Sequence, residues 1–219
     1  MSEQRKFVLW GSSGHAKVLA ETISLQGGCV VALFDNSEVK SSLSGIPVYI
    51  GESQFCNWAE IQGNKIKRIS GLVAIGGARG RDRIAIQDLF RRYGLTVPVL
   101  RHPSSVISST SVLGAGTQVL ALSNIASEVQ LGEACIVNHS ASVDHECKLG
   151  NGVHIAPGAT LCGCVNVADN VFVGAGAIIL PHLSIGANSK IGAGAVVIRN
   201  VPEGVTVVGN PAKPIKLNY

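Results

Sequence analysis

The sequence predicts a small Rossmann-like α/β domain followed by a parallel β-helix built from six-residue repeats. Aliphatic residues recur every six positions from Ile107 to Val197, and a small or β-branched residue follows four positions after almost every one. Before this repeat, short apolar runs typical of strands alternate with segments whose apolar residues are spaced as on one face of a helix. The charge also changes along the chain: residues 1–101 carry thirteen Lys and Arg against eight Asp and Glu, whereas 102–219 carry five against six. These ranges are the two predicted domains.

The six-residue period excludes an α-helix, which repeats at 3.6 residues, and a flat strand, which repeats at two. Three repeats make one triangular turn, in which the aliphatic and the small residue both point inward and stack at roughly 4.8 Å on the next turn. Cys135 and Cys147 occupy small inward positions, so we expect them to be packing residues. Glycines and asparagines such as Gly114, Gly132 and Asn188 fall between, and we expect them at corners that need positive φ.

In the first domain, the apolar run 7–10 leads into a glycine loop at 11–17 and then into helical spacing from Val18. A second strand, 29–34, ends at Asp35, and further strands are expected at 48–50 and 72–75. Parallel strands with intervening helices bind ligands at the carboxyl ends of the strands.

The glycine loop reads G-x-x-G, not the G-x-G-x-x-G of dinucleotide binders, so it does not predict a redox cofactor. Alone, it fits a tight turn as well as a phosphate site at a helix N-terminus. Its surroundings favour a nucleotide, because an acidic residue at a strand end can bond ribose and nearby cations can meet phosphates. The candidate substrate-binding residues are Gly11, Gly14, His15, Lys17, Asp35 and Arg79.

Composition excludes several classes of protein. A net charge of +4 with 5% aromatic residues lacks the basic stripe and stacking platform of a nucleic-acid binder. No apolar run reaches membrane-spanning length and the first residues lack a signal-peptide core, so we expect a cytoplasmic protein without membrane insertion. Its six cysteines are then reduced thiols. Cys162-Gly163-Cys164 has no second pair at ligand spacing, so no metal site is predicted.

Three segments together resemble one family: Gly11-Ser12-Ser13-Gly14-His15-Ala16-Lys17, Asn138-His139-Ser140-Ala141-Ser142-Val143-Asp144-His145-Glu146-Cys147, and Val208-Gly209-Asn210-Pro211-Ala212-Lys213. These segments are similar to those of nucleotide-sugar acetyltransferases that join a small Rossmann-like domain to a left-handed β-helix, a group that includes bacillosamine-pathway N-acetyltransferases and sialic-acid-pathway proteins. The resemblance implies a left-handed β-helix, a homotrimer, acetyl-CoA as cosubstrate, no metal, and a nucleotide-linked amino sugar as acceptor.

The resemblance also assigns roles. It implies that His145 is the general base, that Glu146 orients it, and that Asn138 supports the site. His154 would lie near the acetyl carbonyl, and the Gly163 N–H would contact the thioester oxygen. Ala175, Ala193 and Lys213 would also bind acetyl-CoA, while the N-terminal loop and Asp35 would hold the nucleotide. His139 departs from the family pattern, in which a small or hydroxyl residue is expected.

Spacing adds an argument about assembly. His145 lies two residues after inward-facing Val143, at a corner, and His154 directly precedes inward-facing Ile155, so both should face outward. They are nine residues apart, which is half of an eighteen-residue turn, and therefore point to different sides of one chain. They can share a site only across a subunit boundary, as a homotrimer would provide.

The leading hypothesis is acetyl transfer from acetyl-CoA to the amino group of a nucleotide-linked deoxyamino sugar, a 4-amino-4,6-dideoxy sugar in the narrowest form. O-acetylation of a sugar is the nearest alternative. A γ-type carbonic anhydrase uses the same prism but needs closely spaced histidines, and His182 has no partner five residues on. A non-catalytic nucleotide-sugar-binding scaffold also stays open. The sequence does not discriminate the nucleotide base, the sugar or the acceptor position.

Overall fold

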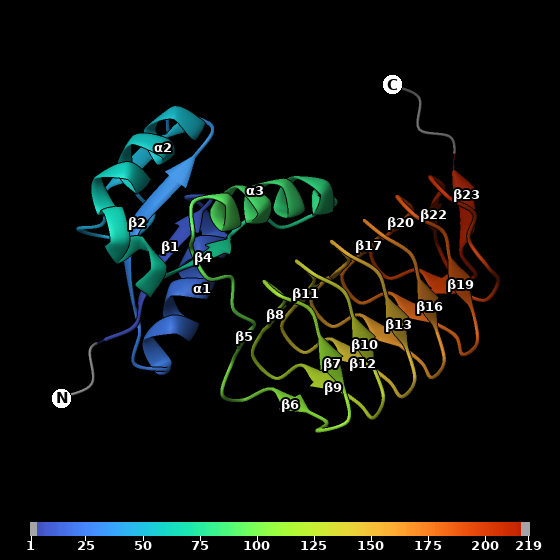
Figure 1. Ribbon diagram of the computed structural model, residues 1–219. Helices are drawn as coiled ribbons and strands as arrows, with labels where there is room; N and C mark the ends of the chain where they lie inside the picture. The colour runs from blue at the N-terminus through green and yellow to red at the C-terminus, as the bar shows by residue number, and fades with distance from the viewer. Residues whose placement is uncertain (1–3, 216–219) are drawn as a thin grey trace.

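The structure is a computed structural model that describes residues 4–215, with an α/β domain beside a three-sided prism of short strands (Figure 1). The first domain has a parallel four-stranded sheet in the order β3-β2-β1-β4. Its elements are β1 (Lys6–Trp10), α1 (Gly14–Leu25), β2 (Cys29–Asp35), β3 (Val48–Ile50), α2 (Gly51–Gln62), the 3-10 helix η1 (Gly63–Arg68), β4 (Ile69–Val73) and α3 (Gly80–Arg92). This confirms the predicted Rossmann-like arrangement.

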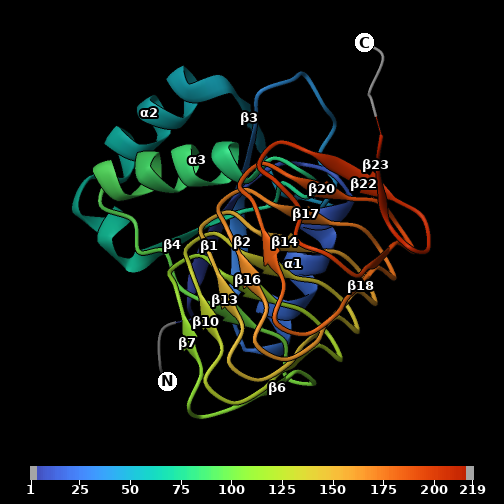
Figure 2. The ribbon, with the colours of Figure 1, turned by 90° about the vertical axis from the view of Figure 1, so that its right-hand side faces the viewer.

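Helices cover both faces of this sheet. On one face, α2 and α3 bury an aromatic cluster in which Phe55 lies 5.0 Å from Phe34 and 5.4 Å from Phe90, measured between ring centroids. On the other face, Leu19 of α1 shares a buried core with Leu120 and Ile136 of the prism. Helix α1 therefore lies between the sheet and the prism (Figures 1 and 2).

The prism has three faces, each a parallel ladder in which, from Leu100 to Val197, a residue pairs with the residue eighteen positions on. Face 1 contains β5 (Leu100–Arg101), β8 (Gln118–Val119), β11 (Ile136–Val137), β14 (His154–Ile155), β17 (Phe172–Val173), β20 (Lys190–Ile191), β22 (Thr206–Val208) and the antiparallel β23 (Lys213–Ile215). Face 2 contains β6 (Val106–Ile107), β9 (Asn124–Ile125), β12 (Ser142–Val143), β15 (Thr160–Leu161), β18 (Ile178–Ile179) and β21 (Val196–Val197). Face 3 contains β7 (Val112–Leu113), β10 (Gln130–Leu131), β13 (Lys148–Leu149), β16 (Asn166–Val167) and β19 (Ser184–Ile185).

The predicted inward columns are confirmed. The aliphatic residues and the small residues four positions later form one continuous buried core, which includes Cys135 and Cys147. Each buried aliphatic side chain stabilises the fold by roughly 1.5–3 kcal/mol relative to an exposed one, so this column holds together strands of only two residues.

The expectation that the repeat glycines supply positive φ is wrong for many of them. Positive φ recurs every six residues, three positions after each repeat aliphatic residue from Leu113 to Ile191, and several of these positions carry side chains, among them Leu122 and Glu146. Gly132 is one position after its aliphatic residue and is not among the positive-φ residues. A Cβ there would lie 2.7 Å from the Gly150 carbonyl carbon, so close stacking of turns requires glycine.

The two parts are joined by polar contacts as well as by the shared core. Gln118 of β8 donates from Nε2 to the Val73 carbonyl at 2.8 Å and contacts the His15 ring through Oε1, also at 2.8 Å. Arg83 of α3 reaches carbonyls of the prism. Within residues 4–215, no helix is long and apolar enough to cross a membrane.

Candidate active site

A cavity of about 320 Å³ opens at the carboxyl ends of β1, β2 and β4, where a parallel sheet binds ligands. Gly11, Asp35 and Arg79, three of the predicted substrate-binding residues, line it together with Ser13 and Gly76. Within residues 4–215, no side chain caps the N-terminus of α1, so the N–H groups of Gly14 and His15 stay available to an anion. The structure therefore gives the predicted nucleotide site a shape and a polar rim.

The glycine loop is held in place by its neighbours. Gly11 has φ +111°, and a Cβ there would lie 2.5 Å from the Ala74 carbonyl oxygen, so this position requires glycine. The Asp35 carboxylate accepts hydrogen bonds from the Ser12 N–H at 2.8 Å and the Ser37 N–H at 3.1 Å. Asp35 thus orders two loops of the cavity wall, in addition to its predicted contact with ribose.

The remaining predicted residues of this domain have different surroundings. His15 is largely buried against Gln118, and burial lowers its pKa despite that hydrogen bond, with the positive charges of Arg83 and His139 adding to the effect. This histidine joins α1 to the prism. Lys17 is exposed and does not line the cavity. Gly14, the first residue of α1, is exposed and also does not line the cavity. Arg79, which does line it, directly precedes α3 and pairs with Asp82 of that helix.

His154 lies directly behind the cavity, with Cε1 3.7 Å from the position a Cβ of Gly76 would take. It faces outward from the prism, as predicted, but the first domain covers it and only 5% of the residue is exposed. Nδ1 contacts the Gly77 carbonyl at 3.3 Å and Nε2 contacts the Asn138 amide nitrogen at 3.2 Å, an arrangement that suits the neutral ring with its proton on Nδ1. Burial, and then the charge of Arg83, lowers its pKa to about 3.

His145 lies elsewhere, at the corner between faces 2 and 3, and its side chain is 53% exposed. Its Nδ1 is 3.0 Å from Glu146 Oε2, the partner that the sequence predicted. The other nitrogen faces Gly163, where a Cβ would come within 2.5 Å of Nε2, so only glycine leaves room for this ring. Asn138 is on face 1 with His154 and not beside His145.

The other cosubstrate residues are also separate from His145 within one chain. Ala175 and Ala193 are exposed at the corner between faces 1 and 2, the corner that His139 shares. Lys213 of β23 is exposed and lines a cavity of about 350 Å³ formed by the C-terminal segment. Within one chain, the predicted residues therefore form separate groups, at the cavity, around His154 and around His145, and these groups do not meet in one site.

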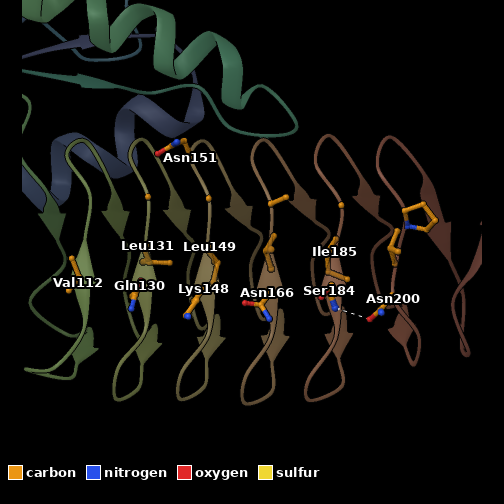
Figure 3. A pocket seen from close by; sticks show the side chains of 17 residues that line it. Val112, Gln130, Leu131, Lys148, Leu149, Asn151, Asn166, Ser184, Ile185 and Asn200 are labelled. Atoms are coloured by element: carbon orange, nitrogen blue, oxygen red, sulfur yellow. Dashed lines mark hydrogen bonds between the residues drawn. The ribbon is translucent and has the colours of Figure 1, made fainter.

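A larger hollow, about 870 Å³, runs along face 3. Successive strands contribute Gln130, Lys148, Asn166 and Ser184 to it, and the Ser184 N–H donates to Asn200 Oδ1 at 2.9 Å (Figure 3). This groove is open, and it contains none of the predicted site residues. Size alone therefore does not identify the site in this fold.

Sequence reasoning missed Arg83, a fully buried cation on α3. Its Nε donates to the Ala134 carbonyl at 2.9 Å and one terminal nitrogen donates to the Gly152 carbonyl at 2.6 Å. The other terminal nitrogen contacts the carbonyls of Ile75 and Gly77 at 3.2 and 3.4 Å, in the segment that separates the cavity from His154. Burial lowers its pKa to about 10. The detectable signal was an arginine at helical spacing with buried apolar residues of α3.

Comparison with known proteins identifies the family. Residues 6–87 match the family model described as the PglD N-terminal domain, and residues 164–199 match that of the bacterial transferase hexapeptide (six repeats). The acetyltransferase domain of PglB from Neisseria gonorrhoeae FA1090, solved in complex with acetyl coenzyme A, is 32% identical over 97% of this chain and 100% of that chain, with a TM-score of 0.86. The chain belongs to the nucleotide-sugar N-acetyltransferases of the hexapeptide-repeat family.

Two further structures of this acetyltransferase family are similar to the chain. PerB from Caulobacter crescentus, in complex with CoA and GDP-perosamine, is 34% identical over 96% of this chain and 97% of that chain, with a TM-score of 0.86. WeeI from Acinetobacter baumannii AYE is 26% identical over 95% and 99%, with a TM-score of 0.84. A search of curated proteins gave no match. The predicted family, fold class, enzyme class and acetyl-CoA cosubstrate are confirmed.

Proposed function

We propose that this acetyltransferase transfers the acetyl group of acetyl-CoA to the amino group of a nucleotide-linked 4-amino-4,6-dideoxy sugar. The observation that carries the proposal is that the chain holds both a cavity of about 320 Å³ at the strand ends and, at a separate corner of the prism, an imidazole–carboxylate pair beside a glycine. PerB, which is similar over nearly the whole chain, is described in complex with CoA and GDP-perosamine, and this supports an amino sugar as acceptor.

His145 is the proposed general base. With its Nδ1–H donating to Glu146, Nε2 carries the free lone pair and faces the corner at Gly163. The sugar amine attacks the thioester carbon and loses a proton to Nε2, forming the C–N bond. The C–S bond then breaks and CoA leaves as its thiolate, which recovers the proton. Positioning, a base and an oxyanion donor are sufficient, so no acyl-enzyme is needed.

Gly163 is the proposed oxyanion donor. Among residues 4–215, no backbone acceptor pairs with its N–H, although its carbonyl accepts from the His182 N–H at 3.1 Å. A backbone N–H without a backbone acceptor is free to bond the thioester oxygen as negative charge develops there. A donor of this kind costs no reorganisation, because the repeat already fixes it.

The active site is proposed to form between copies in a homotrimer. Face 2 and its corners carry five of the large apolar side chains that this structure exposes: Val106, Leu122, Ile178, Leu180 and Ile198. Apolar residues gathered on one surface mark an interface. Covering face 2 with a neighbouring chain brings the corner at His145 beside another copy, whose nucleotide cavity and His154 lie on the opposite side of its prism.

Turnover with purified protein tests the proposal. Acetyl-CoA is incubated with GDP-perosamine or with UDP- or dTDP-linked 4-amino-4,6-dideoxy sugars, and the acetylated product is measured by mass spectrometry. One of these amines should be acetylated, because the cavity accepts a nucleotide and the base accepts an ammonium proton. The matched control is the same nucleotide linked to the 4-hydroxy sugar, which should not react. Acetylation of the control alone would favour the O-acetyltransferase, and no turnover with any acceptor would favour the scaffold.

A further inference from the structure

Three side chains of different chemistry meet at the corner of the proposed base. The ligand atoms of His145, Glu146 and Cys164 all lie within 4.8 Å of one another. Glu146 and Cys164 are eighteen residues apart and hold the same corner position on successive turns, with φ +58° and +60°. Stacking of the repeat therefore places the thiol over the carboxylate, with Cys164 Sγ 3.7 Å from Glu146 Oε2.

The proposed acetyl transfer makes no use of this thiol. Cys164 is partly exposed, and unlike Cys135 and Cys147 it is not among the buried residues of the core. Its pKa is raised, first by removal from water and then by the neighbouring Glu146 charge, so it is not prepared as a nucleophile. Neither packing nor catalysis accounts for a thiol beside the base.

Two of the three ligand–ligand distances are close to those of a tetrahedral zinc site, and the third is within 4.8 Å. With Zn–N and Zn–O bonds of about 2.0–2.2 Å and a Zn–S bond of about 2.3 Å, two ligand atoms of a zinc site lie about 3.3–3.6 Å apart. Here the His145–Glu146 distance is 3.0 Å and the Glu146–Cys164 distance is 3.7 Å. Thiolate and imidazole ligands select zinc over magnesium or calcium, which prefer oxygen alone.

We propose that His145, Glu146 and Cys164 form an inhibitory site for Zn²⁺, with the fourth position open to water; the inhibition rests on the proposed role of His145. Binding replaces the S–H bond of Cys164 with an S–Zn bond and releases that proton to solvent. It also takes the Nδ1 lone pair of His145, so the proton of the neutral ring moves to Nε2. Nε2–H cannot accept a proton from the sugar ammonium, and the base is lost without damage to the fold.

The test separates zinc binding from catalysis. Bound metal is first removed from the protein with a chelator, and the chelator is then removed. ZnCl₂ is titrated in thiol-free buffer during turnover. The product measured is the acetylated sugar, by chromatography, and not released CoA, because the CoA thiol itself binds zinc. Alkylation of Cys164, followed by peptide mass spectrometry, reports binding independently of turnover. Wild-type protein should lose turnover and should show Cys164 protected over the same range of zinc concentration.

Cys164→Ala is the informative variant, and Cys162→Ala, two residues away, is its matched control. Both should turn over normally without zinc. Cys164→Ala should need at least about tenfold more zinc for half-inhibition, while Cys162→Ala should match wild type. Equal zinc sensitivity in all three proteins, or no protection of Cys164, would overturn the site. Protection of Cys164 with undiminished turnover would overturn the inhibition and would count against His145 as the base.

Discussion

Replacing Arg83 with methionine should destabilise the protein by about 3 kcal/mol. Methionine keeps most of the side-chain volume but deletes every donor. The two shortest hydrogen bonds, to the carbonyls of Ala134 and Gly152 at 2.9 and 2.6 Å, are buried and charge-assisted, a type that contributes about 1.5–3 kcal/mol each. The variant no longer has to keep a charged guanidinium out of water, which offsets part of this loss. The net loss of stability falls within the range typical of breaking a buried charged network.

The loss should also reach the nucleotide cavity. The longer contacts of Arg83, to the carbonyls of Ile75 and Gly77, hold the segment that lines the cavity and contacts His154. Without them, the KM for the nucleotide sugar should rise more than that for acetyl-CoA, because His154 contacts this segment, whereas Gly163, Ala175 and Ala193 of the predicted acetyl-CoA residues lie on corners away from it.

Urea denaturation measures the change, with circular dichroism reporting the whole chain and tryptophan fluorescence reporting Trp10 and Trp58 in the first domain. Arg81→Met is the matched control, since Arg81 is exposed on the same helix and only its backbone N–H bonds Asn170. It should stay within about 0.5 kcal/mol of wild type. A loss below about 1 kcal/mol in Arg83→Met, comparable to the control, would refute the role assigned to the buried network.

Three further predictions concern single residues. His154 has a folded pKa of about 3 against 6.5 for the free side chain, so its contribution to stability is present above pH 6.5 and is lost below it, by about 1.4 kcal/mol per pH unit. Urea midpoints measured from pH 7 to 5 test this, and the same dependence of stability on pH in His154→Gln would contradict it. His145→Ala should lower kcat by roughly 10²–10⁴ with acetyl-CoA affinity retained, and Glu146→Ala should fall between this variant and wild type; near-normal turnover of His145→Ala would refute the base. Gly14→Val has open space around its Cβ and should fold, yet it should lose nucleotide-sugar binding in calorimetry while keeping acetyl-CoA; loss of both ligands would contradict the division between the sites.

Most of the fold was predictable because one period sets both packing and register. A residue one position out of step with the six-residue period would leave the buried core, so pairs such as Val137 with Ile155 follow directly from the sequence. Corner conformations were not predictable in the same way. The positive-φ position accepts residues such as Leu122, while glycine is demanded instead where turns stack closely, as at Gly132. The need for glycine at this position comes from contact with the next turn of the prism, which the neighbouring residues in the sequence do not reveal.

The site was predictable to the extent that local position decides function. Gly11 and Asp35 line the cavity because strand ends in a parallel sheet face one edge. The surroundings of His15 and His154 depended on contacts with Gln118 and Gly77, which come from the other part of the chain. Docking of the two parts buried both histidines and lowered both pKa values, an effect that spacing along the sequence does not encode.

Mixed oligomers test the central claim, that the base of one chain acts on a sugar held by another. His145→Ala removes the proposed base but keeps the cavity, whereas Gly14→Val should block the proposed phosphate site but keep that base. Each variant alone should be inactive. Co-expressed in equal amounts with two different tags and purified as mixed trimers, they should recover about a third of wild-type turnover, because every mixed trimer has one boundary in three at which an intact base meets an intact neighbouring cavity. Mixed trimers with no more activity than the separate variants would contradict a shared site.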